Sequence, residues 1–188
     1  MELIEAVRTG DTEAVRHLIA GGTDANAADA EGVTALMHAA YRGDIGMVQL
    51  LLAAGAEVNA TAPGGWTALM KSCYNSELDR GFADVAQVLI DAGANIEAPI
   101  GYGVRPLMLA SGYGETAVVE TLLKAGADVL AKNEGGFTAL MMVKQKFYVD
   151  VINLLHEAEQ LAGLGENSCA SKNAPGSNVI TFLKRPEA

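Results

Sequence analysis

The sequence has little of what several classes of protein require. Only 13 of its 188 residues are lysine or arginine, against 23 acidic residues, and the formal net charge is −10. A nucleic-acid-binding protein neutralises phosphates with a basic surface, so this charge argues against nucleic acid as a partner. Aromatic residues make up only 5% of the chain, as expected when alanine and leucine fill most of the core.

Long apolar runs are also missing. No stretch approaches the ~20 apolar residues of a transmembrane helix, and residues 1–11 lack the basic start and apolar run of a secretory signal. The two cysteines, Cys73 and Cys169, are too few for a disulfide framework or a zinc site. We therefore expect a cytoplasmic protein with no membrane insertion, in which Cys73 is a small buried residue and Cys169 lies in a polar tail.

What the chain does contain is a repeat. Thr-Ala-Leu-Met occurs at 34–37, 67–70 and 138–141, and Arg-Pro-Leu-Met at 105–108, so successive copies are 33, 38 and 33 residues apart. Two sets of glycines keep the same step: Gly10, Gly43, Gly81 and Gly114, and Gly22, Gly55, Gly93 and Gly126. A fixed step of this length predicts a solenoid, in which stacked units share one continuous core.

Each copy predicts a pair of helices. In the best-formed copy, Thr34 suits the N-terminal cap of a first helix, and Gly43 suits the left-handed cap at its end. The spacing of Val48, Leu51 and Leu52 indicates a second amphipathic helix. A turn rich in small and polar residues then leads to the next copy.

These motifs resemble the ankyrin repeat family, whose pattern runs D-x-x-G-x-T-P-L-H, then a Val/Leu-rich second helix and G-A-D-V-N-A. The resemblance covers residues 1 to about 160. It implies an all-α solenoid of about five helix-turn-helix units joined by short β-turn or hairpin loops. Alanine replaces the family's proline at three positions and methionine its histidine at four, where we expect thioether packing: Ala35, Ala68 and Ala139; Met37, Met70, Met108 and Met141.

The repeat also divides the chain. We predict an ankyrin repeat domain over 1–162 and a flexible C-terminal tail over 163–188. The domain comprises an N-terminal cap repeat, three internal repeats and a C-terminal repeat, at 1–28, 29–61, 62–99, 100–132 and 133–162. Five extra residues near 76–80 lengthen the connection between the two helices of the third repeat, and either reach a partner or remain an inert insertion. The tail ends in an apolar run at 179–183, which is either a strand or linear motif, or part of a disordered end.

The resemblance implies that a partner protein binds in the concave groove, to the loops before the first helices and to the exposed ends of those helices. The candidate partner-binding residues at these positions are Tyr41, Arg42, Trp66, Tyr74, Asn75, Tyr102, Tyr113 and Phe137. They include six of the ten aromatic residues in the chain. Such rings are enriched at binding hot spots. The alternative is that some of them, Trp66 and Phe137 above all, pack between neighbouring loops.

No catalytic residue, cofactor or metal site is predicted. His17, His38 and His156 fall in different units without a serine or cysteine nucleophile nearby. The Gly-Tyr-Gly sequences at 101–103 and 112–114 lack the Lys-Ser/Thr of a phosphate loop, and the acidic residues do not have the spacing of a calcium loop.

The expected function is therefore non-catalytic. We expect a monomeric scaffold, adaptor or inhibitor whose acidic surface favours a partner protein with a basic patch. Three alternatives remain open: a regulatory subunit that covers an enzyme's active site, a bacterial effector that acts on a host protein, and an enzyme.

Overall fold

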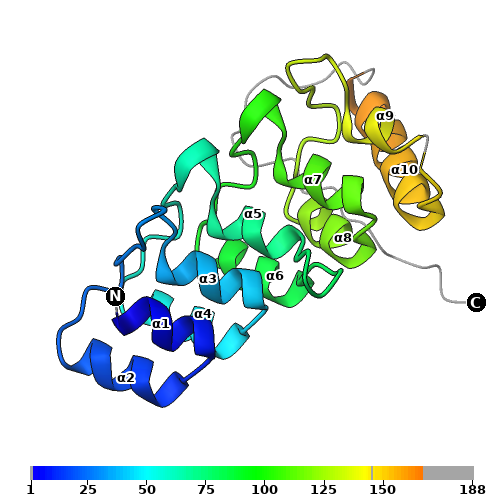
Figure 1. The fold of residues 1–188 in the computed structure, drawn as a ribbon. Coiled ribbons are helices and arrows are strands. Elements are labelled where there is room, and N and C mark those ends of the chain that lie inside the picture. Colours follow the sequence, from blue (N-terminus) through cyan, green and yellow to red (C-terminus); the bar gives the residue numbers. More distant parts are fainter. Residues whose placement is uncertain (1, 145, 167–188) are drawn as a thin grey trace, which may run out of the picture.

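The computed structural model describes residues 2–144 and 146–166. Within these ranges the chain forms ten α-helices, two short 3-10 turns at Pro63–Gly65 and Gly101–Gly103, and isolated β-bridges. Figure 1 shows the helices stacked as pairs in chain order, with the longer loops projecting from one side of the stack. The predicted all-α solenoid is confirmed.

The helices form five antiparallel pairs. Their bounds are α1 (Glu2–Thr9) and α2 (Thr12–Ala20), α3 (Ala35–Arg42) and α4 (Ile45–Ala53), α5 (Ala68–Cys73) and α6 (Ala83–Asp91), α7 (Pro106–Tyr113) and α8 (Thr116–Lys124), and α9 (Ala139–Val143) and α10 (Val149–Glu166). The odd-numbered helices pack each against the next and make a first row. Helices α4, α6, α8 and α10 make the second row.

The repeated threonines begin the first-row helices as predicted. The hydroxyl oxygens of Thr34, Thr67 and Thr138 accept hydrogen bonds from the backbone N–H three residues later, at 3.3, 3.2 and 3.3 Å. Helix α7 has no such cap and begins with Pro106, whose missing N–H suits the first turn. Gly43 ends α3 with φ 72°, the left-handed conformation that glycine adopts without strain.

The core runs through every unit. Met37, Met70 and Met108 are all buried, as expected for methionine side chains that fill the core in place of the family's histidine. The equivalent Met141 is 48% exposed, because it lies in the last pair of helices and no further described unit covers it. Cys73 is buried in the core as predicted, and burial raises the pKa of its thiol to about 12.

A row of side-chain hydrogen bonds joins each loop to the next. Asn26 Oδ1 accepts from the Glu57 N–H at 2.7 Å, and Asn59 Oδ1 accepts from the Asn95 N–H at 2.7 Å. The loop after that follows the same rule, because the Glu97 carboxylate accepts from the Asp128 N–H at 2.9 Å. In each case a polar side chain of one unit satisfies a backbone donor of the following unit. This loop ladder sets the spacing of the loops along the stack.

A second set of hydrogen bonds joins the ends of the first-row helices. The Arg42 guanidinium donates to the Arg8 carbonyl at 2.6 Å, the Asn75 amide donates to the Tyr41 carbonyl, and the Lys146 ammonium donates to the Gly112 carbonyl. The last carbonyls of a helix have no partner within it. Here they are satisfied by the neighbouring unit.

The insertion lies between α5 and α6, as predicted, and forms a closed turn. Asn75 and Arg80 pair across it as a β-bridge, and Asn75 Oδ1 accepts from the N–H groups of Glu77 and Leu78 at 2.8 and 2.9 Å. The hydroxyls of Tyr41 and Ser76 hydrogen bond at 3.0 Å, which ties the insertion to the end of α3.

The last helix is longer than expected. Helix α10 continues to Glu166, past the predicted start of the tail at residue 163. The remainder of the predicted tail, with Cys169 and the apolar run at 179–183, lies outside the described residues. Among the helices that the structure describes, none combines the length and apolar character needed to cross a membrane.

Candidate binding surface on the first row of helices

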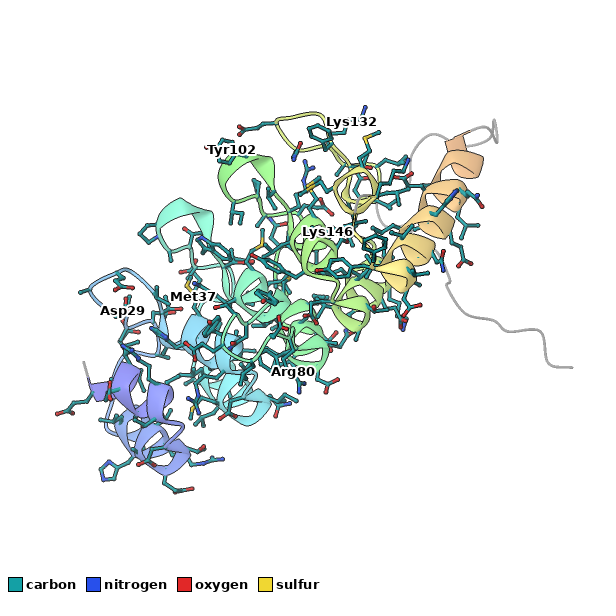
Figure 2. All side chains as sticks on the ribbon, turned by 45° about the vertical axis from the view of Figure 1, so that its right-hand side comes forward. Asp29, Met37, Arg80, Tyr102, Lys132 and Lys146 are labelled. Carbon is teal, nitrogen blue, oxygen red and sulfur yellow. The ribbon has the colours of Figure 1, made fainter. Side chains whose placement is uncertain are left out.

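The candidate residues lie on what we call the first-row face, the exposed side of α1, α3, α5, α7 and α9 together with the loops that precede them. The most exposed ring is that of Tyr102, at 82%, on the 3-10 turn before α7. Phe137 before α9 and Tyr113 at the end of α7 are also exposed, at 52% and 47%. Figure 2 shows Tyr102 on the projecting loop before α7, and Asp29 and Met37 towards the other end of the stack.

Two half-buried rings of this face flank a lysine. The Nζ atom of Lys71, in α5, lies 4.8 Å from the centre of the Trp66 ring and 5.9 Å from the centre of the Tyr41 ring. An ammonium near the faces of aromatic rings is attracted by their negative quadrupole. Trp66 comes from the loop before α5 and Tyr41 from the end of α3, so the stacking of units is what brings these three side chains together.

A pair of stacked rings joins the third unit to the fourth. The rings of Tyr74 and Tyr113 lie 3.7 Å apart between centres, with 4° between their planes. The Tyr74 hydroxyl donates to Asp79 Oδ1 at 2.9 Å, and this hydrogen bond to a carboxylate, followed by burial, raises the pKa of Tyr74 above its ordinary value. One face of each tyrosine is therefore occupied by the other.

The structure corrects the expectation that Asn75 is exposed. Its side chain is only 2% exposed, and its amide is used inside the insertion and against Tyr41. Arg42, by contrast, is exposed, although one of its guanidinium nitrogens donates a hydrogen bond to the Arg8 carbonyl. We therefore remove Asn75 from the candidate set and keep Arg42.

A cavity of about 370 Å³ opens on the first-row face beside α3. It is lined by residues of the first three units, namely Arg8, Glu31, Val33, Met37, His38, Tyr41, Arg42, Lys71 and Glu77. At its edge, His38 Nε2 and Asp29 Oδ2 are 2.8 Å apart. Burial acts to raise the pKa of Asp29, but hydrogen bonds from His38 and from two backbone N–H groups lower it overall.

The sequence did not single out Lys71. It occupies the repeat position that holds His38 in the second unit and Leu109 in the fourth, so no motif marks it. Its position one residue after the Thr-Ala-Leu-Met motif, on a first helix, was the only available signal.

Two kinds of reactive site are relevant to the described residues around the cavity, a nucleophile with its base and a metal site. Among the described residues, no serine, threonine or cysteine side chain hydrogen bonds to the Asp29–His38 pair, and there is no cluster of three or more metal-ligating side chains. The cavity is lined by aromatic, apolar and charged side chains.

Taken together, a stack of helix pairs with loops on one side defines a helical repeat protein, a class whose stacked units form extended binding surfaces. A family model of ankyrin repeats in three copies matches residues 3–100, and a model of a single ankyrin repeat matches residues 102–134. The chain belongs to the ankyrin repeat family, and the resemblance inferred from its motifs is confirmed. The pair α9 and α10 lies beyond these matches and continues the same stack. A comparison with curated proteins gives no match.

Proposed function

We propose that this protein is a non-catalytic binding module, a scaffold, adaptor or inhibitor, that acts as a monomer in the cytoplasm and holds a partner protein in a groove along the first-row face. The observation that carries the proposal is the placement of exposed rings. Tyr102, Tyr113 and Phe137 leave much of their surface in water on one face of two consecutive units. Such rings provide large and stiff contact area.

The size of the surface and its charge support the same proposal. Four or five units supply a partner with an interface of roughly 1,600 Å² in total, the standard size for a specific complex. The net charge of −10 favours a partner that carries a basic patch and meets this protein faster at low salt. An association rate that does not change with salt would remove the basic patch from the proposal.

The decisive experiment is affinity purification of the tagged protein from its own cells, compared with the variant Tyr102→Ala/Phe137→Ala. Both rings are exposed, so the variant should fold normally, and it should lose a partner that the parent protein captures. The matched control is His17→Ala/His156→Ala, which removes two exposed rings from α2 and α10 and should retain the partner. Equal capture by all three proteins would contradict the proposal.

The identity of a captured partner also separates the forms of the proposal. An enzyme whose turnover falls on binding would make this protein a regulatory subunit. A protein from a host cell would make it an effector. A partner that keeps its activity while joined to a third protein would make it a scaffold or adaptor.

A further inference from the structure

Positive charge gathers in one place on this acidic protein. Arg8, Arg42 and Lys71 come from three consecutive units and line the same cavity of about 370 Å³. We call it the cation pocket. All three lie in the last turns of first-row helices, where the helix dipole favours cations. The helix dipole accounts for the presence of these cations in the last turns. It does not account for their lack of ion pairs with carboxylates among the described residues.

The Lys71 ammonium lies against two aromatic rings but has no carboxylate partner in the described part of the chain. It lies against Trp66 and Tyr41, and the side chain is half-buried. Some other cations of the described part of the chain do pair with carboxylates: Arg105 with Glu97 at 3.2 Å and Lys124 with Glu120 at 3.3 Å. No such ion pair is found for Lys71 among the described residues.

The neighbouring groups leave room for an anion. Arg42 uses one guanidinium nitrogen on the Arg8 carbonyl, which fixes its position at the wall of the pocket. The two acidic lining residues, Glu31 and Glu77, are exposed and form no ion pair with these cations. Val33 and Met37 supply apolar wall, which suits the short methylene stem of an acidic side chain.

We infer that the cation pocket receives an aspartate or glutamate side chain from the partner protein, whose carboxylate pairs with Lys71 and Arg42. The inference rests on the proposed function and names the chemistry of one contact within it. Charge-assisted hydrogen bonds of this kind are the strong ones. A basic patch elsewhere on the partner is compatible with it, since the overall charge acts on the approach while the pocket acts within about 8 Å, the screening length at physiological salt.

The single tryptophan of the chain provides the measurement. Trp66 is the only one and lies beside Lys71, so its fluorescence reports on the pocket. The probes are end-capped tetraglutamate, tetraglutamine and tetralysine peptides, titrated into the full chain at about 0.15 M ionic strength to screen the overall repulsion. We expect saturable binding of tetraglutamate with a dissociation constant of about 1 mM or tighter, and none of tetraglutamine or tetralysine.

Two variants locate the binding. Lys71→Met keeps the length of the side chain, removes its charge and should weaken tetraglutamate binding roughly tenfold, while Lys71→Arg should restore most of it. The matched control is Lys124→Met, which changes the net charge by the same amount on α8 and should bind as the parent protein does. Calorimetric titration of each variant gives the affinity independently of any change in the tryptophan signal, and thermal unfolding checks the fold.

Three results would overturn the inference: no saturable binding in the millimolar range, equal binding of tetraglutamine or tetralysine, or equal weakening by Lys71→Met and Lys124→Met. None of these touches the proposed function, which depends on the loss of partner capture in the Tyr102→Ala/Phe137→Ala variant. If the Tyr102→Ala/Phe137→Ala variant loses the partner but tetraglutamate does not bind the parent protein, the proposed groove stands and the carboxylate contact is rejected.

Discussion

The two halves of the first-row face use the same repeat positions in different ways. In the first three units the rings of Trp66 and Tyr41 pack around a lysine and the insertion folds against α3. In the last two units the rings of Tyr102 and Phe137 are exposed to solvent, and Phe147, at the turn between α9 and α10, is 98% exposed. The rings of one half are thus held by contacts within the chain, whereas the other half leaves apolar surface exposed, which is the surface that the proposed partner would cover.

The largest expected effect on the free energy of unfolding comes from Met70 and Met141, which occupy the same repeat position in the two halves. Met70 is 0% exposed, so Met70→Ala should lower the free energy of unfolding by about 2–5 kcal/mol through lost burial and a cavity. The equivalent Met141 is half exposed, and Met141→Ala should cost less than about 1 kcal/mol. Urea unfolding of both variants measures the difference, and similar costs would show that the last unit is covered in solution.

The next effect concerns two glycines that end first-row helices. A Cβ atom on Gly43 would lie 2.3 Å from the buried ring of Phe82, and one on Gly114 would lie 2.8 Å from the more exposed ring of Tyr148. Both substitutions to alanine bear the strain of a positive φ, about 1–3 kcal/mol. Gly43→Ala should cost about 1–3 kcal/mol more through overpacking, because Phe82 has less room to move. Equal melting temperatures for the two variants would contradict this.

A smaller effect is expected where the two halves meet. Tyr113→Ala removes the ring that stacks on Tyr74, and should lower the free energy of unfolding by about 0.5–1.5 kcal/mol. Tyr113→Phe keeps the stack and serves as the control, with stability close to that of the parent. If the two variants were equally stable, the stack would contribute nothing to joining the units.

The smallest effect depends on pH. Against the opposing effect of burial, the pKa of Asp29 is lowered in the folded chain by hydrogen bonds from His38 and two backbone N–H groups. These hydrogen bonds therefore stabilise the fold above the unfolded carboxyl pKa of about 3.9, and their contribution is lost as pH falls through the lower folded value. Asp29→Asn should be less stable than the parent at pH 6, by under about 1 kcal/mol, with a difference that shrinks towards pH 2. Unfolding curves across this range test the sign, and a difference that grows on acidification would reverse it.

Local features of the fold were the most predictable from sequence. Thr34 caps its helix and Gly43 ends it because each acts on residues within a few positions of itself. Because these residues recur at a fixed step, the stacking of the units was also predictable. The length of α10 was not evident, since residues 163–166, Gly-Leu-Gly-Glu, begin a stretch rich in glycine, serine, asparagine and proline, a composition that indicates a linker.

The candidate site was less predictable, because its geometry depends on neighbouring units. Asn75 occupies a position that is exposed in an uninterrupted repeat, but the five-residue insertion turns back on it and buries it. Lys71 became notable only once Trp66 and Tyr41 were seen on either side of it. The overall charge likewise did not reveal that three cations share one cavity.

The loop ladder gives the stack a direction. Asn26 and Asn59 each supply both a donor and an acceptor to the following loop, so each of these two following loops is held by the unit that precedes it. During synthesis from the N-terminus, the asparagine that accepts a hydrogen bond from the next loop is therefore made before that loop. Removal of units from the start of the chain would deprive the following loop of the asparagine that holds it, whereas removal from the end leaves the earlier loops and their asparagines in place.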